Sequence, residues 1–357
     1  MPSAENASAA TRQGAVPSFE MPSDRTFVTE IATGLGALGE DDLASVIACR
    51  TPVLTNLSDS DWDKLSELWH SGAYAVDFDA GFKNGGAFFC ARDGLNGRHP
   101  RLVEWTGGRR PPGDEVVPSD LRVDHVYLVS CKYLSRILHN SSPARLFEGL
   151  LTQDPVEDLS DWYQRLAPVE YQMLYEACVD AVRDTDETDT AFPALASELA
   201  RSQRRCLSKV LHDGWPSGAR SAYERLCGVV AEATAKIWSS QIDKRNAESV
   251  VWRLLRIGSA PYFILGTSPQ GSMRLRIDTP WDWRQRYRLL GLDVAPQAGG
   301  QPRVRWSARY RVRRTSEERA VNGHVEIRWS HGRFAQPPEA KVYLDTMHRD
   351  VPGYNPL

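Results

Sequence analysis

The sequence predicts an α/β (α+β) protein, with an α/β core, a helical region and a β-rich basic region. Three patterns support this order: an amphipathic helix at 58–71 before a strong strand at 126–133, helical periodicity over 158–257, and two-residue alternation at 303–313. The 357 residues suffice for two or three domains. No apolar run approaches the roughly 18 residues that a membrane helix needs.

These patterns divide the chain into four parts. Residues 1–25 are small and polar and lack the features of a secretion signal, so we expect a disordered tail. An α/β core at 26–157, a helical region at 158–257 and a β-rich region at 258–357 follow. The six cysteines show no CxxC spacing, which predicts a cytoplasmic protein without a zinc ribbon or a disulfide framework.

The first firm element is a helix at 58–71, with a serine N-cap and with Gly72 as its stop. Before it, residues 26–50 are expected to be partly helical. After it, short alternating or apolar runs predict strands at 73–80, 87–91 and 101–105. The strand at 126–133 should pair with residues 116–123 through a turn at Asp124-His125, and a helix should follow at 143–151.

The later elements follow the same rules. Long amphipathic helices are expected at 217–239 and 243–257, and a shorter helix at 282–290 with Trp281 and Trp283 buried. Strands are expected at 262–265, 273–277, 304–312, 324–329 and 341–344.

One segment carries the residues of a candidate active site. Residues two apart share a face of a strand, so Ser130 and Lys132 point the same way, and the hairpin sets Asp120 on the neighbouring strand. An acid, a lysine and a further oxygen ligand at the end of adjacent strands suit a hard cation such as Mg²⁺. Such an ion polarises a phosphoryl oxygen and activates water, while the lysine orients that water or neutralises charge.

The segment resembles the PD-(D/E)xK nuclease superfamily, in which an Asp near one strand end precedes an acid-x-Lys on the next strand. Here the motif reads Pro-Ser-Asp120, nine residues, then Ser130-Cys-Lys132, with a serine where an acid is usual. The resemblance covers about residues 58–157. It implies a restriction-endonuclease-like mixed sheet core, Mg²⁺ as cofactor, Asp120 as metal ligand, Lys132 as the residue that positions water, and Ser130 in support.

Two glutamates enter through the same resemblance. One branch with Ser-x-Lys takes its missing carboxylate from the following helix, which implies Glu148, sixteen residues after Lys132. The superfamily also often places a Glu on its first helix, and Glu67 in the helix at 58–71 matches that place as a second metal ligand. Glu104 is an alternative donor, and Asp77 with Asp79 could share a strand face, although both sets also suit solvated strand positions.

A purely structural interpretation remains open for the motif. Asp120 could hydrogen-bond a turn, and Lys132 could reach solvent from a strand end. Against this interpretation, a lysine within an otherwise apolar strand is costly unless it is paired.

The C-terminal region is basic: residues 251–357 hold 18 Lys and Arg against nine Asp and Glu, so a polyanionic partner is plausible. In residues 303–313, five arginines fall on odd positions and apolar residues take the even ones, which predicts a strand with one packed face and one face of guanidinium groups. A solvated edge strand would tolerate mixed charges better, so we favour a nucleic-acid surface. It comprises Arg303, Arg305, Arg309, Arg311, Arg313, Arg328, His331 and Arg333, the last three on and beside a predicted hairpin tip at 330–332.

The sequence therefore predicts a Mg²⁺-dependent endonuclease that binds double-stranded DNA, and the resemblance implies a restriction or antiphage role and often a homodimer. Three alternatives remain: a non-catalytic DNA-binding or scaffold subunit with a decayed core, an RNA-binding or RNA-cleaving protein, and a module whose basic strand binds an acidic protein. Ser130 favours the first alternative. A-form major grooves exclude an arginine strand, so competition with RNA separates the second.

Overall fold

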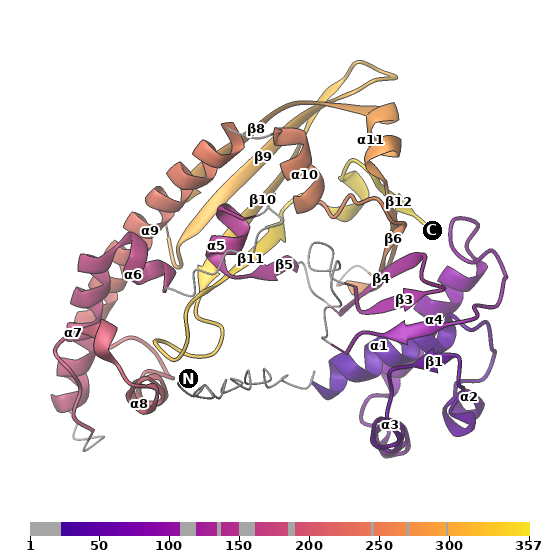
Figure 1. Cartoon of the computed structure of the whole chain (residues 1–357), viewed down its shortest axis with the longest axis horizontal. Coiled ribbons are helices and arrows are strands. Elements are labelled where there is room, and N and C mark those ends of the chain that lie inside the picture. The colour runs from indigo at the N-terminus through magenta and orange to yellow at the C-terminus, as the bar shows by residue number, and fades with distance from the viewer. Residues whose placement is uncertain are drawn as a thin grey trace, which may run out of the picture.

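The computed structural model describes residues 23–107, 119–133, 137–149, 161–184, 190–243, 246–268, 271–297 and 299–357. The described part is a mixed α/β structure with two sheets. Its ribbon has the outline of an arch, with the first four helices in one arm and α7, α8 and α9 in the other (Figure 1).

The larger sheet, sheet A, is mixed. Most neighbouring strands run antiparallel, but β1 pairs with β2, and β4 with β6, in parallel. Its strands, in spatial order, are β1 Leu54–Thr55, β2 Val103–Trp105, β3 Leu121–Val123, β4 Tyr127–Tyr133, β6 Tyr262–Ser268, β7 Gly271–Ile277 and β12 Tyr354–Pro356. The predicted strands at 101–105, 126–133, 262–265 and 273–277 are thus confirmed. Sheet A also draws strands from both the α/β core and the β-rich region, so the sequence regions do not coincide with the sheets.

Helices α1 and α4 cover one face of sheet A. Apolar side chains from both helices, such as Phe27 and Phe88, join a buried cluster with Val103 and Val129 of the sheet. Two further helices flank this layer at the end of the arm (Figure 1). The four helices are α1 Asp24–Gly36, α2 Leu43–Cys49, α3 Asp59–Ser71 and α4 Ala75–Cys90.

Helix α3 matches its prediction, and α4 does not. Ser58 and Asp61 form a capping box at the start of α3, and Gly72 ends it in the left-handed conformation. The strands predicted at 73–80 and 87–91 are wrong, because both segments belong to the single helix α4. Helix α4 buries Phe78, Gly81, Gly85 and Phe88 at helical spacing, and its glycines let α1 approach closely.

The helical region is confirmed between the gaps in the described residues. Its longest helix, α9, runs along the smaller sheet, as Figure 1 shows. The predicted helix at 143–151 is shorter in the structure, with its C-cap at Glu148, and positions 150–151 lie outside the described residues. The helices are α5 Pro143–Phe147, α6 Trp162–Leu166, α7 Pro168–Asp184, α8 Arg201–Val210, α9 Ser217–Asp243 and α10 Ala247–Leu254, with a 3-10 turn at Ala196–Glu198.

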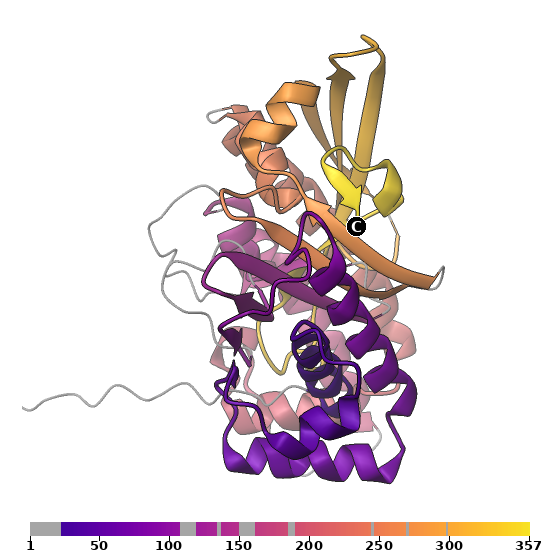
Figure 2. The same ribbon diagram turned by 90° about the vertical axis from the view of Figure 1, so that its right-hand side faces the viewer.

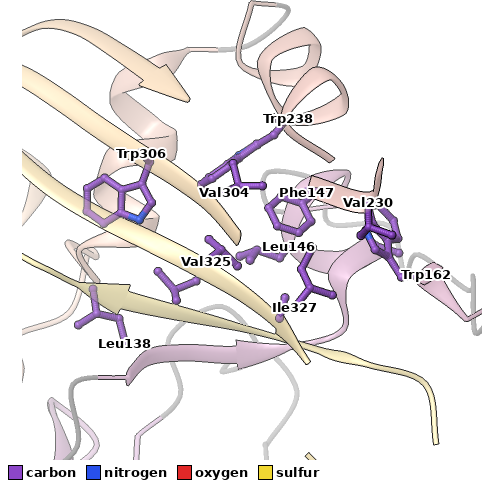
Figure 3. Close-up of a cluster of buried hydrophobic side chains, with 14 of the residues drawn as sticks. Leu138, Leu146, Phe147, Trp162, Val230, Trp238, Val304, Trp306, Val325 and Ile327 are labelled. Atoms are coloured by element: carbon purple, nitrogen blue, oxygen red, sulfur yellow. The ribbon is translucent and has the colours of Figure 1, made fainter. Parts of the chain in front are cut away.

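The smaller sheet, sheet B, is antiparallel. In spatial order its strands are β5 Ile137–Ser141, β11 Glu339–Leu344, β10 Glu318–Arg328, β9 Arg303–Val312 and β8 Tyr287–Gln297. One face carries Trp306, Val325 and other apolar side chains into a core shared with α5, α6 and α9, which Figure 3 draws in close-up. The far ends of the long strands rise beyond the other elements (Figure 2).

The predicted helix at 282–290 is wrong in its second half. Helix α11 Pro280–Arg286 begins at a Thr279 capping box, and β8 starts directly at Tyr287. Trp283 is fully buried as expected, whereas Trp281 is 69% exposed. A short 3-10 turn, His348–Asp350, precedes β12. The expected disordered tail falls almost wholly on residues 1–22, which lie outside the described part of the chain.

Candidate functional site

The β3–β4 hairpin brings Asp120 and Ser130 together. Asp124 and His125 both have positive φ angles, of 52° and 58°, which close a tight turn between the strands, as predicted. The hairpin register pairs Leu121 with Val129 and so sets Asp120 opposite Ser130. One carboxylate oxygen of Asp120 accepts a hydrogen bond from Ser130 Oγ at 3.1 Å and another from the Cys131 amide at 2.6 Å.

Lys132 extends this group along β4. It lies two residues after Ser130, and therefore on the same face of the strand. Burial is the main cause that lowers the pKa of Lys132 below its ordinary value, and the nearby Arg256 lowers it further, whereas Asp120 opposes the change. A lysine with a lowered pKa can exchange a proton closer to neutral pH.

The Lys132 backbone is fixed by the neighbouring strand β6. Gly266 pairs with Lys132, and a Cβ atom at Gly266 would lie 1.9 Å from the Lys132 carbonyl oxygen. Only glycine therefore fits opposite the lysine at this spacing between the strands.

Glu30 joins the site from helix α1, a position that the sequence analysis missed. It is 7% exposed, and its carboxylate accepts a hydrogen bond from Trp105 Nε1 at 2.7 Å. Burial first, and the negative charge of Asp120 second, raise the pKa of Glu30 to about 8, while Lys132 counteracts them. An acid on the buried face of an apolar helix is costly without a function or a partner, and this signal in Phe27–Leu35 was available in the sequence.

Glu67, the glutamate expected on the first helix, lies elsewhere. It is an exposed residue of α3, and α3 is not the helix that packs on β4. Glu30 of α1 is a helical glutamate whose raised pKa reflects, after burial, the charge of Asp120, and the role of Glu67 stays a prediction.

Glu148 is engaged in a different contact. It caps the end of α5 and forms an ion pair with Arg165 of α6. The Asp120 side chain, in contrast, hydrogen-bonds within the described residues to Ser130 and Cys131 alone. The structure does not pair Glu148 with Asp120.

The other acids considered as alternative ligands are also neutralised locally. Glu104 accepts two hydrogen bonds from Arg122, at 2.7 and 3.0 Å, and this interaction is the main cause that lowers its pKa. Asp77 and Asp79 do not share a strand face, because they lie on helix α4. The first pairs with Arg25 at 3.2 Å and the second with Lys83 at 2.8 Å.

A buried network lies behind the site. Arg256 is 4% exposed, has a left-handed φ of 59°, and donates a hydrogen bond to Tyr262 Oη at 2.7 Å. Tyr262, on β6, is also hydrogen-bonded to Ser130. A chain of contacts therefore runs from Arg256 through Tyr262 and Ser130 to Asp120, and it fixes the hydroxyl that stands where the resemblance expects an acid.

The donor set suits Mg²⁺ better than a metal that needs a full protein cage. No cluster of three or more His, Cys, Asp or Glu that could hold a metal occurs in the described ranges. Mg²⁺, however, usually takes only one or two carboxylates and completes its shell with water and substrate phosphate. Asp120 is a carboxylate of this kind, and Glu30 is a second acid whose pKa is raised first by burial and then by the negative charge of Asp120.

The alternating strand β9 has the expected packed face. Val304, Trp306 and Ala308 are fully buried, and Tyr310 is 3% exposed. These side chains fix which face the arginines occupy.

Several arginines on the guanidinium face of β9 are already paired with other groups of the protein. Acids on the neighbouring strands pair with three of its members: Arg303 with Glu326, Arg309 with Asp293, and Arg311 with Glu318. Arg313 donates to the carbonyls of Arg284 and Tyr287. Arg305 is exposed and has no ion-pair partner among the described residues. The expectation of an uncompensated row is wrong, because the acids come from other strands.

The remaining basic residues do not continue this face as one surface. Arg328 lies 3.6 Å from Glu326, and His331 lies 3.4 Å from Glu339. Arg333 turns toward α8, where it donates to the Leu211 carbonyl. The loop between β10 and β11 spans 329–338 and so is longer than the predicted hairpin tip.

Comparison of the chain with protein-family models, with curated proteins and with solved structures found no match. None of the helices in the described segments combines the length and the apolar character needed to cross a membrane.

Proposed function

We propose that this protein is a metal-dependent endonuclease that hydrolyses phosphodiester bonds in DNA. The observation that carries the proposal is the contact of Asp120 with Ser130 and Cys131 beside Lys132 on β4, together with the raised pKa of Glu30, to which the charge of Asp120 contributes after burial. Charged groups gathered in a partly buried place, with perturbed pKa values, are typical of active sites.

Each residue of the site has its own role in the proposed reaction. Asp120 and Glu30 would hold Mg²⁺, and Ser130 holds Asp120 in place through its hydrogen bond. When bound, the ion supplies charge neutralisation at the phosphate and activates a water molecule. Lys132 can accept a proton from the attacking water or return one to the leaving oxygen when the phosphorus–oxygen bond breaks.

The mixed sheet also supports a restriction-endonuclease-like core. Strands β2, β3 and β4 form an antiparallel series, β6 adds in parallel beside β4, and α1 packs on this sheet. In this proposal Glu30 takes the role that the resemblance gives to a glutamate on the first helix. The core extends the resemblance beyond residues 58–157 to include α1 and β6.

DNA is the favoured substrate because of the basic C-terminal strands, among which Arg305 is exposed and has no ion-pair partner among the described residues. A restriction or antiphage role and dimeric cleavage follow from the resemblance and belong to the same proposal.

A second candidate is a DNA-binding subunit without catalysis. It is favoured by Ser130, which supplies a hydroxyl where a third carboxylate would strengthen the metal site. Such a protein would bind DNA equally well with Mg²⁺ or with a chelator.

Cleavage of plasmid and lambda DNA in Mg²⁺, Mn²⁺ or EDTA tests the proposal. We expect metal-dependent cutting that falls at least about 100-fold in Lys132→Ala, since a general acid or base typically contributes 10²–10⁴-fold. Equal cutting by this variant would contradict the proposed site. No cutting, together with DNA binding that survives EDTA, would favour the second candidate.

A further inference from the structure

A pocket of about 570 Å³ lies in the arm opposite to the candidate active site. It opens between α8, the start of α9, and the loops that precede β9 and follow β10. Figure 1 shows α8 in one arm of the arch and α1 in the other. The volume falls within the range of small-molecule sites.

Flat side chains form one wall of this pocket. The rings of Trp215 and Tyr223 stack with centroids 4.5 Å apart and an angle of 29° between their planes. Trp329 lies beside them, 6.0 Å from Trp215. The guanidinium group of Arg333 sits 4.6 Å from the centroid of the Trp215 ring. A planar, electron-rich ligand could extend this stack over the guanidinium or over Trp329.

The pocket also holds positive charge. Arg333 is fixed by the carbonyls of Leu211 and His212 and has no carboxylate partner within the described part of the chain, so its charge stays available. Arg328 lies on the same wall, and its Nε atom is buried without a hydrogen-bond partner. The side-chain oxygen of Gln301 is likewise buried without a partner.

Gly332 lets the loop on one side of the pocket pack closely against α8. Gly332 has a φ of +97°, and a Cβ atom there would lie 2.1 Å from Ser208 Oγ on α8. The loop that carries Trp329 and Arg333 can therefore rest directly on α8 only with glycine at this position.

We propose that this pocket binds a nucleotide, with its base against the flat wall and its phosphate at Arg333 and Arg328. A bare phosphate would leave the aromatic wall unused, and an apolar ligand would lie against the Arg333 guanidinium group without balancing its charge. The assignment of the ligand as one nucleotide of a DNA strand, swung out of the stack, rests on the proposed function. A free mononucleotide has the same chemistry.

The proposal is tested by calorimetric titration in the presence of EDTA. The ligands are deoxyadenosine monophosphate, a single-stranded 12-mer, and a duplex of the same sequence. We expect Trp215→Ala and Arg333→Gln each to weaken binding of the mononucleotide and the single strand at least about tenfold, because stacking on an aromatic ring contributes roughly 1–3 kcal/mol per base. Arg205→Ala, an exposed arginine of α8 outside the pocket, and Trp281→Ala, an exposed tryptophan of α11, should bind like the unaltered protein.

The outcomes separate this inference from the nuclease proposal. Binding of the mononucleotide alone would assign the pocket to a free nucleotide, and binding of the strands as well would assign it to DNA. Unaltered protein that binds none of the three ligands, or binding that both correctly folded pocket variants retain, would overturn the inference even if the protein cuts DNA. Lys132→Ala should bind normally, since it lies outside the pocket, so a failed cleavage assay leaves this test intact.

Discussion

At the residue scale, Glu30 is a buried acid whose ionised form is disfavoured in the folded protein. Its carboxylate is buried and, among the described residues, accepts a hydrogen bond from Trp105 Nε1. The raised pKa of about 8 means that folding favours the protonated form. A divalent cation would favour the ionised form instead, so metal and proton compete for the same oxygen atoms.

The raised pKa of Glu30 predicts that Glu30→Gln stabilises the protein, and that this gain depends on pH. The native pKa lies above the ordinary value of 4.5, so the contribution of Glu30 is fully present below pH 4.5 and is lost as pH rises through 8. Glutamine keeps the acceptor for Trp105 and cannot ionise. In EDTA we expect the variant to be more stable at pH 8 by on the order of 1–3 kcal/mol, and by much less at pH 5.

Urea unfolding at the two pH values measures this difference, with the exposed Glu67→Gln as control. A difference in stability between Glu30→Gln and the unaltered protein that is the same at pH 5 and pH 8 would contradict the assignment.

At the scale of elements, the contact between α1 and α4 positions Glu30. A Cβ atom at Gly85 of α4 would lie 2.1 Å from the Thr33 carbonyl oxygen of α1, whereas the adjacent Gly86 has nothing within 4 Å. Thr33 lies less than one helical turn from Glu30. If α1 were displaced at its contact with Gly85, the carboxylate of Glu30 would therefore move relative to Asp120.

Alanine at these two neighbouring glycines should have opposite effects. Gly85→Ala should lower the free energy of unfolding by roughly 1–3 kcal/mol through overpacking and also reduce cleavage. Gly86→Ala should raise it by up to about 1 kcal/mol, because alanine favours the helix. Thermal unfolding and the plasmid assay compare them. Equal effects of the two substitutions would show that the helices do not pack as described.

The elements that could be predicted from the sequence are those whose ends are set by residues close by in the chain. The cap at Ser58 and the stop at Gly72 defined α3, and the apolar run with its turn defined the β3–β4 hairpin that joins Asp120 to Ser130. Helix α4 was missed because its glycines serve a contact with α1, and small residues alternating with others resemble a strand. Glu30 could be noticed as an acid among the apolar residues of α1, but its place beside sheet A depends on tertiary packing.

At the scale of the whole molecule, charge neutralisation depends on strands distant in sequence. Glu326 of β10 pairs with Arg303 of β9, and Asp293 of β8 pairs with Arg309, so no inspection of β9 alone could have revealed these partners. The surface of sheet B consequently presents alternating charges, with Arg305 as an exposed guanidinium among them.

This distribution predicts a difference between two arginines in DNA binding. Each phosphate contact adds about 0.9 to the slope of log affinity against log salt concentration for duplex DNA. Arg305→Ala should therefore reduce the slope by about one, and Arg309→Ala, which removes an arginine already paired with Asp293, should reduce it by less. Fluorescence anisotropy over a KCl series measures both. An unchanged slope in Arg305→Ala would remove this face from the DNA interface.

The most direct test of the central claim compares two glutamates. Glu30 is buried and the charge of Asp120 contributes to its raised pKa, whereas Glu67 is exposed on α3. In the Mg²⁺-dependent cleavage assay we expect Glu30→Gln to lose at least about 100-fold in rate, in the range found when one charge-stabilising group is removed, and Glu67→Gln to cut at the unaltered rate. Equal activity of the two variants, or loss in Glu67→Gln alone, would contradict the account.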